Sequence, residues 1–296
     1  MSMMAQFSFT YLLTLLWLLV SHPVTGSFLS LGLSQRQSNN ETVERVPLRI
    51  LPLGASITWG MHSSDSNGYR EFLRDQLREE GWEVDMIGSL SIGSMQDNNV
   101  EAKSGNTIDQ VKAAASSSLP YKPNVVLINA GTNDCRLEIG ITRAGERMRS
   151  LIEKLISSKD MKSTLVVLST LIPSGNGIIA RHTPAVNEQY RALARTMREE
   201  GTSVVLAEMN GPNSSITYPA DFIQDGKLDG THPGDDGYAK MAHIWYEAIT
   251  GAASQGLIPL PAVVESSGTL SYSRSLSGIT GTVSIGLLSM AMAVQI

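Results

Sequence analysis

Five short apolar runs, separated by segments with helical periodicity, constrain the fold of this 296-residue chain more than any other feature of its sequence. The runs are rich in Val, Ile and Leu and cover residues 49–53, 84–87, 125–130, 165–169 and 204–207. Runs of this length that alternate with helices are typical of buried strands in a parallel sheet. We therefore predict an α/β fold, a three-layer α/β/α sandwich built on a doubly wound parallel sheet of about five strands.

The segments between the runs repeat every three to four residues, as amphipathic helices do. Two sets carry this spacing: Phe72, Leu73, Gln76 and Leu77 ahead of Gly81, and Val186, Tyr190, Leu193 and Met197 ahead of Gly201. A glycine directly after such a set is a common helix end. A last helix is predicted to begin near residues 232–233, where a proline and two following aspartates suit a helix N-terminus, and to run to about residue 250.

One domain is predicted over residues 47–255, because no repeat or low-complexity segment interrupts it. Ahead of it, the apolar run 11–20 would span about 15 Å as a helix, half of what a bilayer core requires. Small residues follow that run, so we expect residues 1–26 to be a secretory signal peptide and residues 27–46 a polar leader. The alternative is that the run is an uncleaved membrane anchor.

The two ends of the chain also suggest where the protein resides. Residues 256–296 pass from small residues through a polar stretch to a weakly apolar end, which resembles the signal for a glycosylphosphatidylinositol (GPI) anchor. A disordered Ser-rich tail is the alternative. Glycosylation sequons at Asn40 and Asn213 suit the secretory route. We therefore expect a secreted, extracellular protein. Whether a GPI lipid also attaches it to the membrane at the cell surface is left open.

Charge and cysteine content exclude several functions. With 23 basic and 28 acidic residues, the formal net charge of −5 offers no basic excess for nucleic acid. The single cysteine, Cys135, excludes an intrachain disulfide and a multi-cysteine metal site. We expect His62 and His182 in loops and His243 packed within a helix, none of them with a metal-ligand companion. We thus expect no metal and no cofactor, and the sequence carries no signal for an oligomeric state.

Polar residues follow the predicted strands, where open parallel sheets bind ligands. A serine attacks an acyl carbon only when a neighbouring base takes its proton and a carboxylate orients that base. Ser56, His232 and Asp229 can supply these roles, and Asp229 lies only three residues before His232. The backbone N–H groups of Ser56 and Gly105 and the side-chain amide of Asn133 can stabilise the oxyanion.

Each of these motifs also has an ordinary structural explanation. Ser56 and Asn133 could cap helices, and Gly105 could satisfy a turn. Their ordered combination favours catalysis. Cys135, directly after Asp134, is expected to be a buried unpaired thiol and not a nucleophile.

The blocks GASIT, a later lone glycine, GTND and DGTHP, in this order, resemble the SGNH (GDSL-type) hydrolases. More closely, RILPLGASITWG, NGYR, KSGNTID, NAGTNDC and DGTHPGDDGYAKMA look like the fungal branch near carbohydrate esterase family three. The likeness covers about residues 49–250 and implies a flavodoxin-like fold. It also implies Ser56 as nucleophile, Ser56, Gly105 and Asn133 as oxyanion donors, and Asp229 and His232 as acid and base. One departure is Ala55, where the family usually has Asp; we expect it to alter the loop more than the mechanism.

The resemblance implies a secreted serine esterase that removes a small acyl group, acetyl above all, from an extracellular polysaccharide. Activity is expected to fall as the pH drops through about 6–7, where histidine side chains take up a proton. Two alternatives remain open: a hydrolase of lipid or secondary-metabolite esters, and a noncatalytic surface protein that binds glycans.

Overall fold

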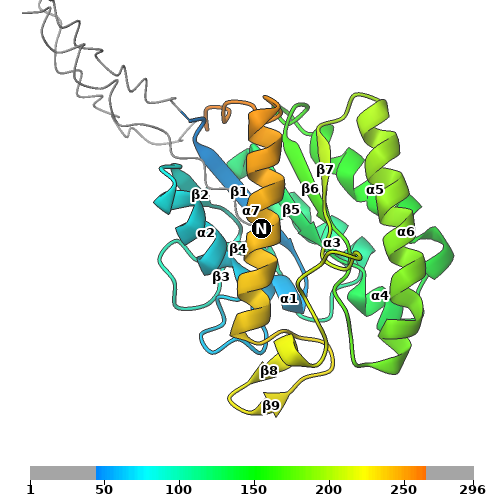
Figure 1. Cartoon of the computed structure of the whole chain (residues 1–296). Helices are drawn as coiled ribbons and strands as arrows, with labels where there is room; N and C mark the ends of the chain where they lie inside the picture. Colours follow the sequence, from blue (N-terminus) through cyan, green and yellow to red (C-terminus); the bar gives the residue numbers. More distant parts are fainter. Residues whose placement is uncertain (1–44, 265–296) are drawn as a thin grey trace, which may run out of the picture. The chain divides into compact units, whose positions relative to one another are not determined.

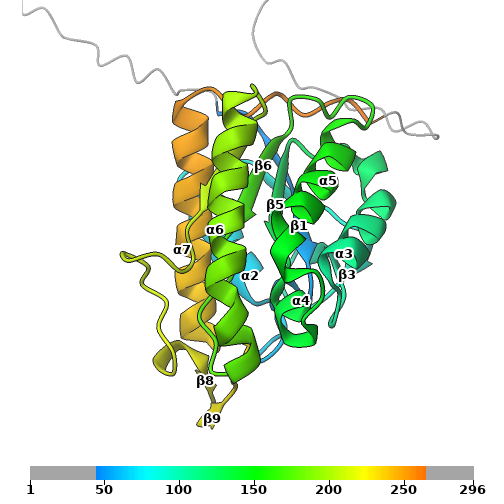
Figure 2. The ribbon, with the colours of Figure 1, turned by 90° about the vertical axis from the view of Figure 1, so that its right-hand side faces the viewer.

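The computed structural model describes residues 45–264, which form a central sheet between two layers of helices (Figures 1 and 2). The predicted signal peptide, the Asn40 sequon and the predicted anchor signal from residue 265 onward lie outside the described residues. Within the described range, no helix is both long enough and apolar enough to cross a bilayer.

The sheet is mainly parallel and has seven strands. They are β1 (Leu48–Gly54), β2 (Val84–Met86), β3 (Leu90–Ser91), β4 (Asn99–Ala102), β5 (Val125–Asn129), β6 (Leu165–Ser169) and β7 (Val204–Ala207). The order is β3-β4-β1-β5-β6-β7, and β2 also pairs with β1. On one side of β1, β2 pairs with its first residues and β4 with its last, while β5 runs along the other side. This is the flavodoxin-like strand order, so the predicted fold class is confirmed.

The strand count differs from the predicted five because two strands carry no apolar run. β3 pairs antiparallel with β4, and β4 contains Asn99 and Glu101. These strands are held by backbone hydrogen bonds at the edge of the sheet, so hydrophobic periodicity does not mark them. A separate two-stranded hairpin, β8 (Ile223–Gln224) with β9 (Lys227–Leu228), is missed for the same reason.

The helices cover both faces of the sheet. They are α1 (Ser56–Trp59), α2 (Tyr69–Glu79), α3 (Ile108–Ala114), α4 (Thr132–Leu137), α5 (Ala144–Ile156), α6 (Gly177–Glu199) and α7 (Asp235–Ser254), with short 3-10 turns at Ala115–Ser117, Leu119–Tyr121, Ile141–Arg143 and Ala220–Phe222. α2 and α7 lie side by side over one face (Figure 1). α3, α5 and α6 cover the other face. Alternate strand residues serve the two cores: Leu51 and Val126 face one, and Ile50 and Val125 the other.

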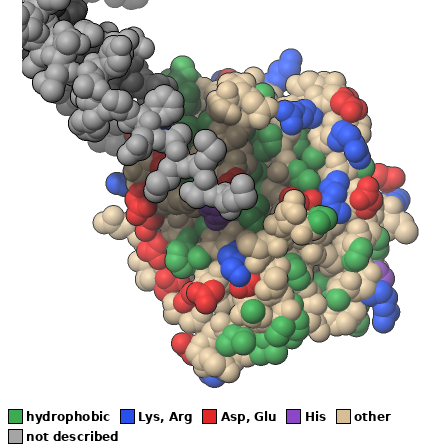
Figure 3. Space-filling view, viewed as in Figure 1, with side chains coloured by type: hydrophobic (Ala, Val, Ile, Leu, Met, Phe, Trp, Pro, Cys, Tyr) green, Lys and Arg blue, Asp and Glu red, His purple; other side chains and the backbone are tan. Residues whose placement is uncertain are grey.

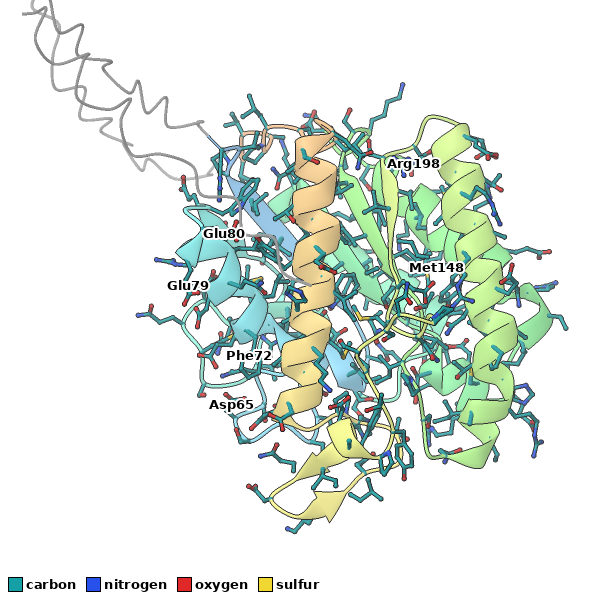
Figure 4. The ribbon with its side chains drawn as sticks, viewed as in Figure 1. Asp65, Phe72, Glu79, Glu80, Met148 and Arg198 are labelled. Atoms are coloured by element: carbon teal, nitrogen blue, oxygen red, sulfur yellow. The ribbon has the colours of Figure 1, made fainter. Side chains whose placement is uncertain are left out.

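The predicted helices at α2, α6 and α7 are confirmed, with corrections to individual side chains. Val186, Tyr190, Leu193 and Met197 are all buried on α6. Phe72, labelled in Figure 4, is instead 41% exposed, because Tyr69, Leu73 and Leu77 form the buried face of α2. These three follow one another at steps of four residues along one face, and Phe72 lies about 100° around the helix from Leu73.

Two histidine predictions were wrong. His182 lies within α6 and not in a loop, because Asn176 caps that helix early by accepting hydrogen bonds from the N–H groups of Ile178 (3.1 Å) and Ile179 (3.2 Å). His243 lies on α7 as predicted, but its side chain is 56% exposed and does not pack in the core. It lies over the surface of α7, stacked on Tyr246.

Contacts continue beyond residue 255, the predicted end of the domain. Side chains at the amino ends of the strands hold the last described residues: Asn124 donates to Pro259 O (2.8 Å) and Arg49 to Ala262 O (3.0 Å). At the other terminus, the Arg45 guanidinium stacks 5.0 Å from the centre of the Trp82 ring. Both ends of the described chain therefore meet the amino edge of the sheet.

The buried face of α2 contributes to the stability of the fold. Leu73→Ala removes a fully buried side chain between α2 and the sheet, so the free energy of unfolding is expected to fall by about 2–5 kcal/mol. The neighbouring Phe72→Ala is the matched control and should cost less than about 1 kcal/mol, because that ring is exposed. Urea denaturation followed by circular dichroism measures both. Equal losses in the two variants would contradict the assigned helix face.

Candidate active site

The predicted site residues come together at the carboxyl edge of the sheet, the lower end in Figure 1. Ser56 opens α1 directly after β1, Gly105 follows β4, and Asn133 lies in α4 after β5. Asp229 directly follows the β8–β9 hairpin. Parallel strands place their carboxyl ends at one edge, which brings Ser56, Gly105 and Asn133 together, whereas Asp229 and His232 come from the loop after the separate hairpin.

Ser56 is held by a short, well-bonded turn. It is the first residue of the four-residue helix α1 and is only 6% exposed. Two backbone hydrogen bonds close the turn, from Trp59 N–H to Ala55 O (2.9 Å) and from Met61 N–H to Ser56 O (3.0 Å). Ala55, which stands where the resembling family usually has Asp, provides no side-chain cap. The backbone therefore fixes Ser56 without a carboxylate at position 55.

His232 lies between Ser56 and Asp229. Its Nε2 is 2.9 Å from Ser56 Oγ, although the two residues are 176 positions apart in the sequence. Its Nδ1 is 3.2 Å from Asp229 Oδ1. An ionised carboxylate only accepts hydrogen bonds, so Nδ1 carries the proton and Nε2 of the neutral ring can accept from the Ser56 hydroxyl.

The Asp229 carboxylate also folds the loop on which it lies. Oδ1 accepts hydrogen bonds from the backbone N–H groups of Thr231 (2.6 Å) and His232 (2.8 Å). Partial burial by itself would raise the pKa of Asp229, but these N–H donors and the His232 ring favour the ionised form more strongly. The pKa of Asp229 therefore lies below its ordinary value, and the carboxylate stays charged over the range in which histidines titrate.

The three candidate oxyanion donors, Ser56 N–H, Gly105 N–H and the Asn133 amide, all follow strands at this edge of the sheet. Within residues 45–264, no protein acceptor takes the N–H of Ser56 or of Gly105. Gly105 has a φ of +86°, a left-handed conformation that side-chain-bearing residues rarely adopt. The Asn133 amide donates from Nδ2 to Asn106 O (3.0 Å), which sets that amide against the loop containing Gly105.

Two charged side chains that the sequence did not single out support these donors. Arg136 donates to Asn133 Oδ1 (3.1 Å), which fixes the orientation of the amide. The fully buried Asp134 carboxylate accepts from Ile108 N–H (3.0 Å) and forms an ion pair with Arg147 (2.7 Å). It therefore ties α4 to the start of α3, just beyond Gly105. The only sequence signal for Asp134 is its place inside the GTND block.

The remaining reactive side chains do not join this group. Cys135 is fully buried, and burial, with a smaller contribution from the charge of Asp134, raises the pKa of its thiol to about 12. A thiol that stays protonated is a poor nucleophile. His182 contacts Glu138 (2.9 Å), and the predicted loop placement of His62 is confirmed. In the described part of the chain, no three side chains of His, Cys, Asp or Glu gather closely enough to hold a metal ion.

Comparisons with known proteins show which family model and which relatives the chain matches. A family model described as "GDSL-like Lipase/Acylhydrolase family" matches residues 53–240, more than half of the chain. A curated multidomain esterase of Ruminococcus flavefaciens is 29% identical over 238 residues; the match covers 69% of this chain but only 28% of that longer protein.

Solved structures share the fold. The family 3 carbohydrate esterase of Clostridium thermocellum has a TM-score of 0.61 at 24% identity, covering 72% of this chain and all of that one. A carbohydrate esterase family 3 protein from Talaromyces cellulolyticus has a TM-score of 0.56 at 19% identity, covering 70% of this chain and 99% of that one.

The geometry predicts how Ser56 reacts with a fluorophosphonate probe. Folded protein is expected to be labelled, Ser56→Ala to lose labelling altogether, and His232→Ala to react at least about a hundredfold more slowly without its base. Cys135→Ala is the control and should react as wild type. Labelling that persists in Ser56→Ala would contradict the assignment of Ser56 as the reacting residue.

Proposed function

The chain belongs to the GDSL-like lipase/acylhydrolase family, and on that premise we propose that it is a serine esterase that removes acetyl groups from a polysaccharide. One observation carries the catalytic part: Ser56 Oγ lies 2.9 Å from His232 Nε2, while Asp229 lies at the opposite ring nitrogen. This is the arrangement that a serine needs to become a nucleophile.

In the first half of the reaction, Ser56 Oγ attacks the ester carbonyl and His232 Nε2 takes its proton. The negative charge that develops on the carbonyl oxygen is met by the N–H groups of Ser56 and Gly105 and by the Asn133 amide. His232 then gives the proton to the leaving alcohol oxygen, and an acyl group remains on Ser56.

In the second half, His232 takes a proton from water, and the resulting nucleophile attacks the acyl-enzyme. Collapse of the intermediate releases the acid and returns the proton to Ser56. Asp229 keeps the ring in one tautomer and stabilises its charged form throughout. Neither half of the proposed reaction uses a metal or a cofactor.

The acetyl and polysaccharide parts of the proposal rest on likeness. The chain resembles carbohydrate esterase family three in its motifs, and two proteins of that name share its fold. The related Ruminococcus protein is named a multidomain esterase, which adds support for ester hydrolysis. Fold alone does not define a substrate, so the acyl group and the alcohol need a direct test.

A second candidate, a hydrolase of lipid or secondary-metabolite esters, is favoured by the surface near Asp229. Ile223 and Leu228 of the β8–β9 hairpin are 47% and 53% exposed, and Leu228 directly precedes Asp229. Figure 3 shows hydrophobic side chains gathered at the lower end of the molecule, where Figure 1 places this hairpin. Apolar side chains beside a site suit a longer acyl chain.

Hydrolysis of p-nitrophenyl esters from acetyl to octanoyl separates these candidates. We expect the fastest turnover on acetate, a decline with chain length, and loss of turnover in Ser56→Ala; release of acetate from an acetylated polysaccharide is then measured directly. A preference for octanoyl would favour the lipid or metabolite ester. Folded protein without Ser56-dependent turnover would favour a noncatalytic glycan-binding protein.

We further propose that the protein is secreted and glycosylated. The apolar run at residues 11–20 and the two sequons support this route. Asn213 is exposed in a turn between β7 and the β8–β9 hairpin, where the oligosaccharide transfer machinery can reach it. GPI attachment rests on the sequence of the tail alone.

Expression in a eukaryotic secretory host tests this proposal. We expect protein in the medium that loses mass on enzymatic removal of N-linked glycans, with a smaller loss in Asn213→Gln. Release from the cell surface by a phosphatidylinositol-specific phospholipase would identify a GPI anchor. Full-length protein retained in the cytoplasm without glycan would contradict the proposed route.

A further inference from the structure

Three hydrogen-bond donors converge on one backbone carbonyl inside the loop that carries Asp229 and His232. Gly230 O accepts from the Ser174 hydroxyl (2.6 Å), from Gly175 N–H (2.9 Å) and from Asn176 N–H (3.1 Å). The donors are consecutive residues between β6 and α6. A carbonyl oxygen has two lone pairs, so three donors on it restrict its position strongly.

The donor segment is itself held at both ends. β6, which pairs with β5 and β7, ends at Ser169, and Asn176 caps the first turn of α6. Ser174 Oγ also accepts from Asn176 N–H (3.1 Å), which closes the segment on itself. The Ser174 hydroxyl thus links a rigid part of the fold to Gly230.

Close packing joins the same segment to the residues that precede Asp229. A Cβ added to Gly175 would lie 2.1 Å from the Tyr218 ring, so any larger residue at position 175 would have to displace that ring. Tyr218 packs edge-on against Phe222 with ring centres 5.3 Å apart, and Phe222 O accepts from Asp229 N–H (2.9 Å). The segment therefore contacts the catalytic loop through Gly230 and, by way of these rings, through Asp229.

We propose that Ser174, Gly175 and Asn176 position the Asp229–His232 pair for reaction with Ser56, acting through the Gly230 carbonyl. Gly230 lies directly after Asp229 and two residues before His232, so a shift of its carbonyl moves both side chains. The inference rests on the proposed esterase function, and none of the three residues needs to contact the substrate. A displacement of about 1 Å between reacting groups can lower a rate by about a hundredfold.

The test compares Ser174→Ala with Ser174→Thr, which keeps the hydroxyl, and with Ser214→Ala as a matched control. The Ser214 hydroxyl makes a similar hydrogen bond to a backbone carbonyl, Met209 O (2.7 Å), but contacts no residue of the site. The measurements are kcat and KM on p-nitrophenyl acetate, the rate of fluorophosphonate labelling of Ser56, and Tm.

We expect Ser174→Ala to lower kcat and the labelling rate by about tenfold or more with KM within about twofold, as for a group that acts on the reacting geometry. Ser174→Thr should restore most of the loss, and Ser214→Ala should match wild type in both rates. Gly175→Ala, which must displace the Tyr218 ring, is expected to show the same loss of kcat. It replaces Ser174→Ala as the test variant if Ser174→Ala does not fold.

Folded Ser174→Ala and Gly175→Ala with wild-type kcat and labelling rate would overturn the proposal. The proposal would also be overturned if Ser214→Ala lost kcat as well and the loss in each variant followed its decrease in Tm. Such a result would reflect general destabilisation. Failure of the proposed function is distinguishable, because wild-type protein would then neither react with the probe nor hydrolyse the ester.

Discussion

One carboxylate oxygen, Asp229 Oδ1, couples the folding of the catalytic loop to the orientation of its histidine. It accepts from Thr231 N–H and His232 N–H and lies 3.2 Å from His232 Nδ1. The backbone donors help to keep the carboxylate ionised, and the ionised carboxylate fixes the ring tautomer. The same atom therefore both closes the loop through two backbone N–H groups and contacts the ring of His232.

The sheet positions Ser56 next to the His232 ring. β1 has β4 on one side and β5 on the other, so the strand order reverses there, and open α/β sheets place their ligand sites at such a point. Ser56 follows β1, Gly105 follows β4 and Asn133 follows β5. Ser56 and the three proposed oxyanion donors therefore follow neighbouring strands, and only the Asp229–His232 pair comes from elsewhere in the fold.

Rigid attachments around the site explain why Ala55 is compatible with it. Backbone hydrogen bonds close the turn at Ser56, and the Asp134 carboxylate connects α4 to α3. Residues 174–176, which follow β6, hold the Gly230 carbonyl. The carboxylate that orients His232 is supplied by Asp229. A short turn held by its own backbone does not require a further acid at position 55.

The sequence by itself determined the buried strands, the inner face of α6 and the local Asp229–His232 pair, because each depends on spacing within one segment. It did not reveal β3 and β4, which pair through their backbones, or the outward direction of Phe72, which depends on how α2 packs beside α7 and against the sheet. The 2.9 Å approach of Ser56 to His232 and the convergence of Ser174, Gly175 and Asn176 on Gly230 were likewise decided only in the folded protein. Periodicity encodes which side of a segment is buried, whereas contacts between distant segments depend on the packing of the whole sheet and its helices.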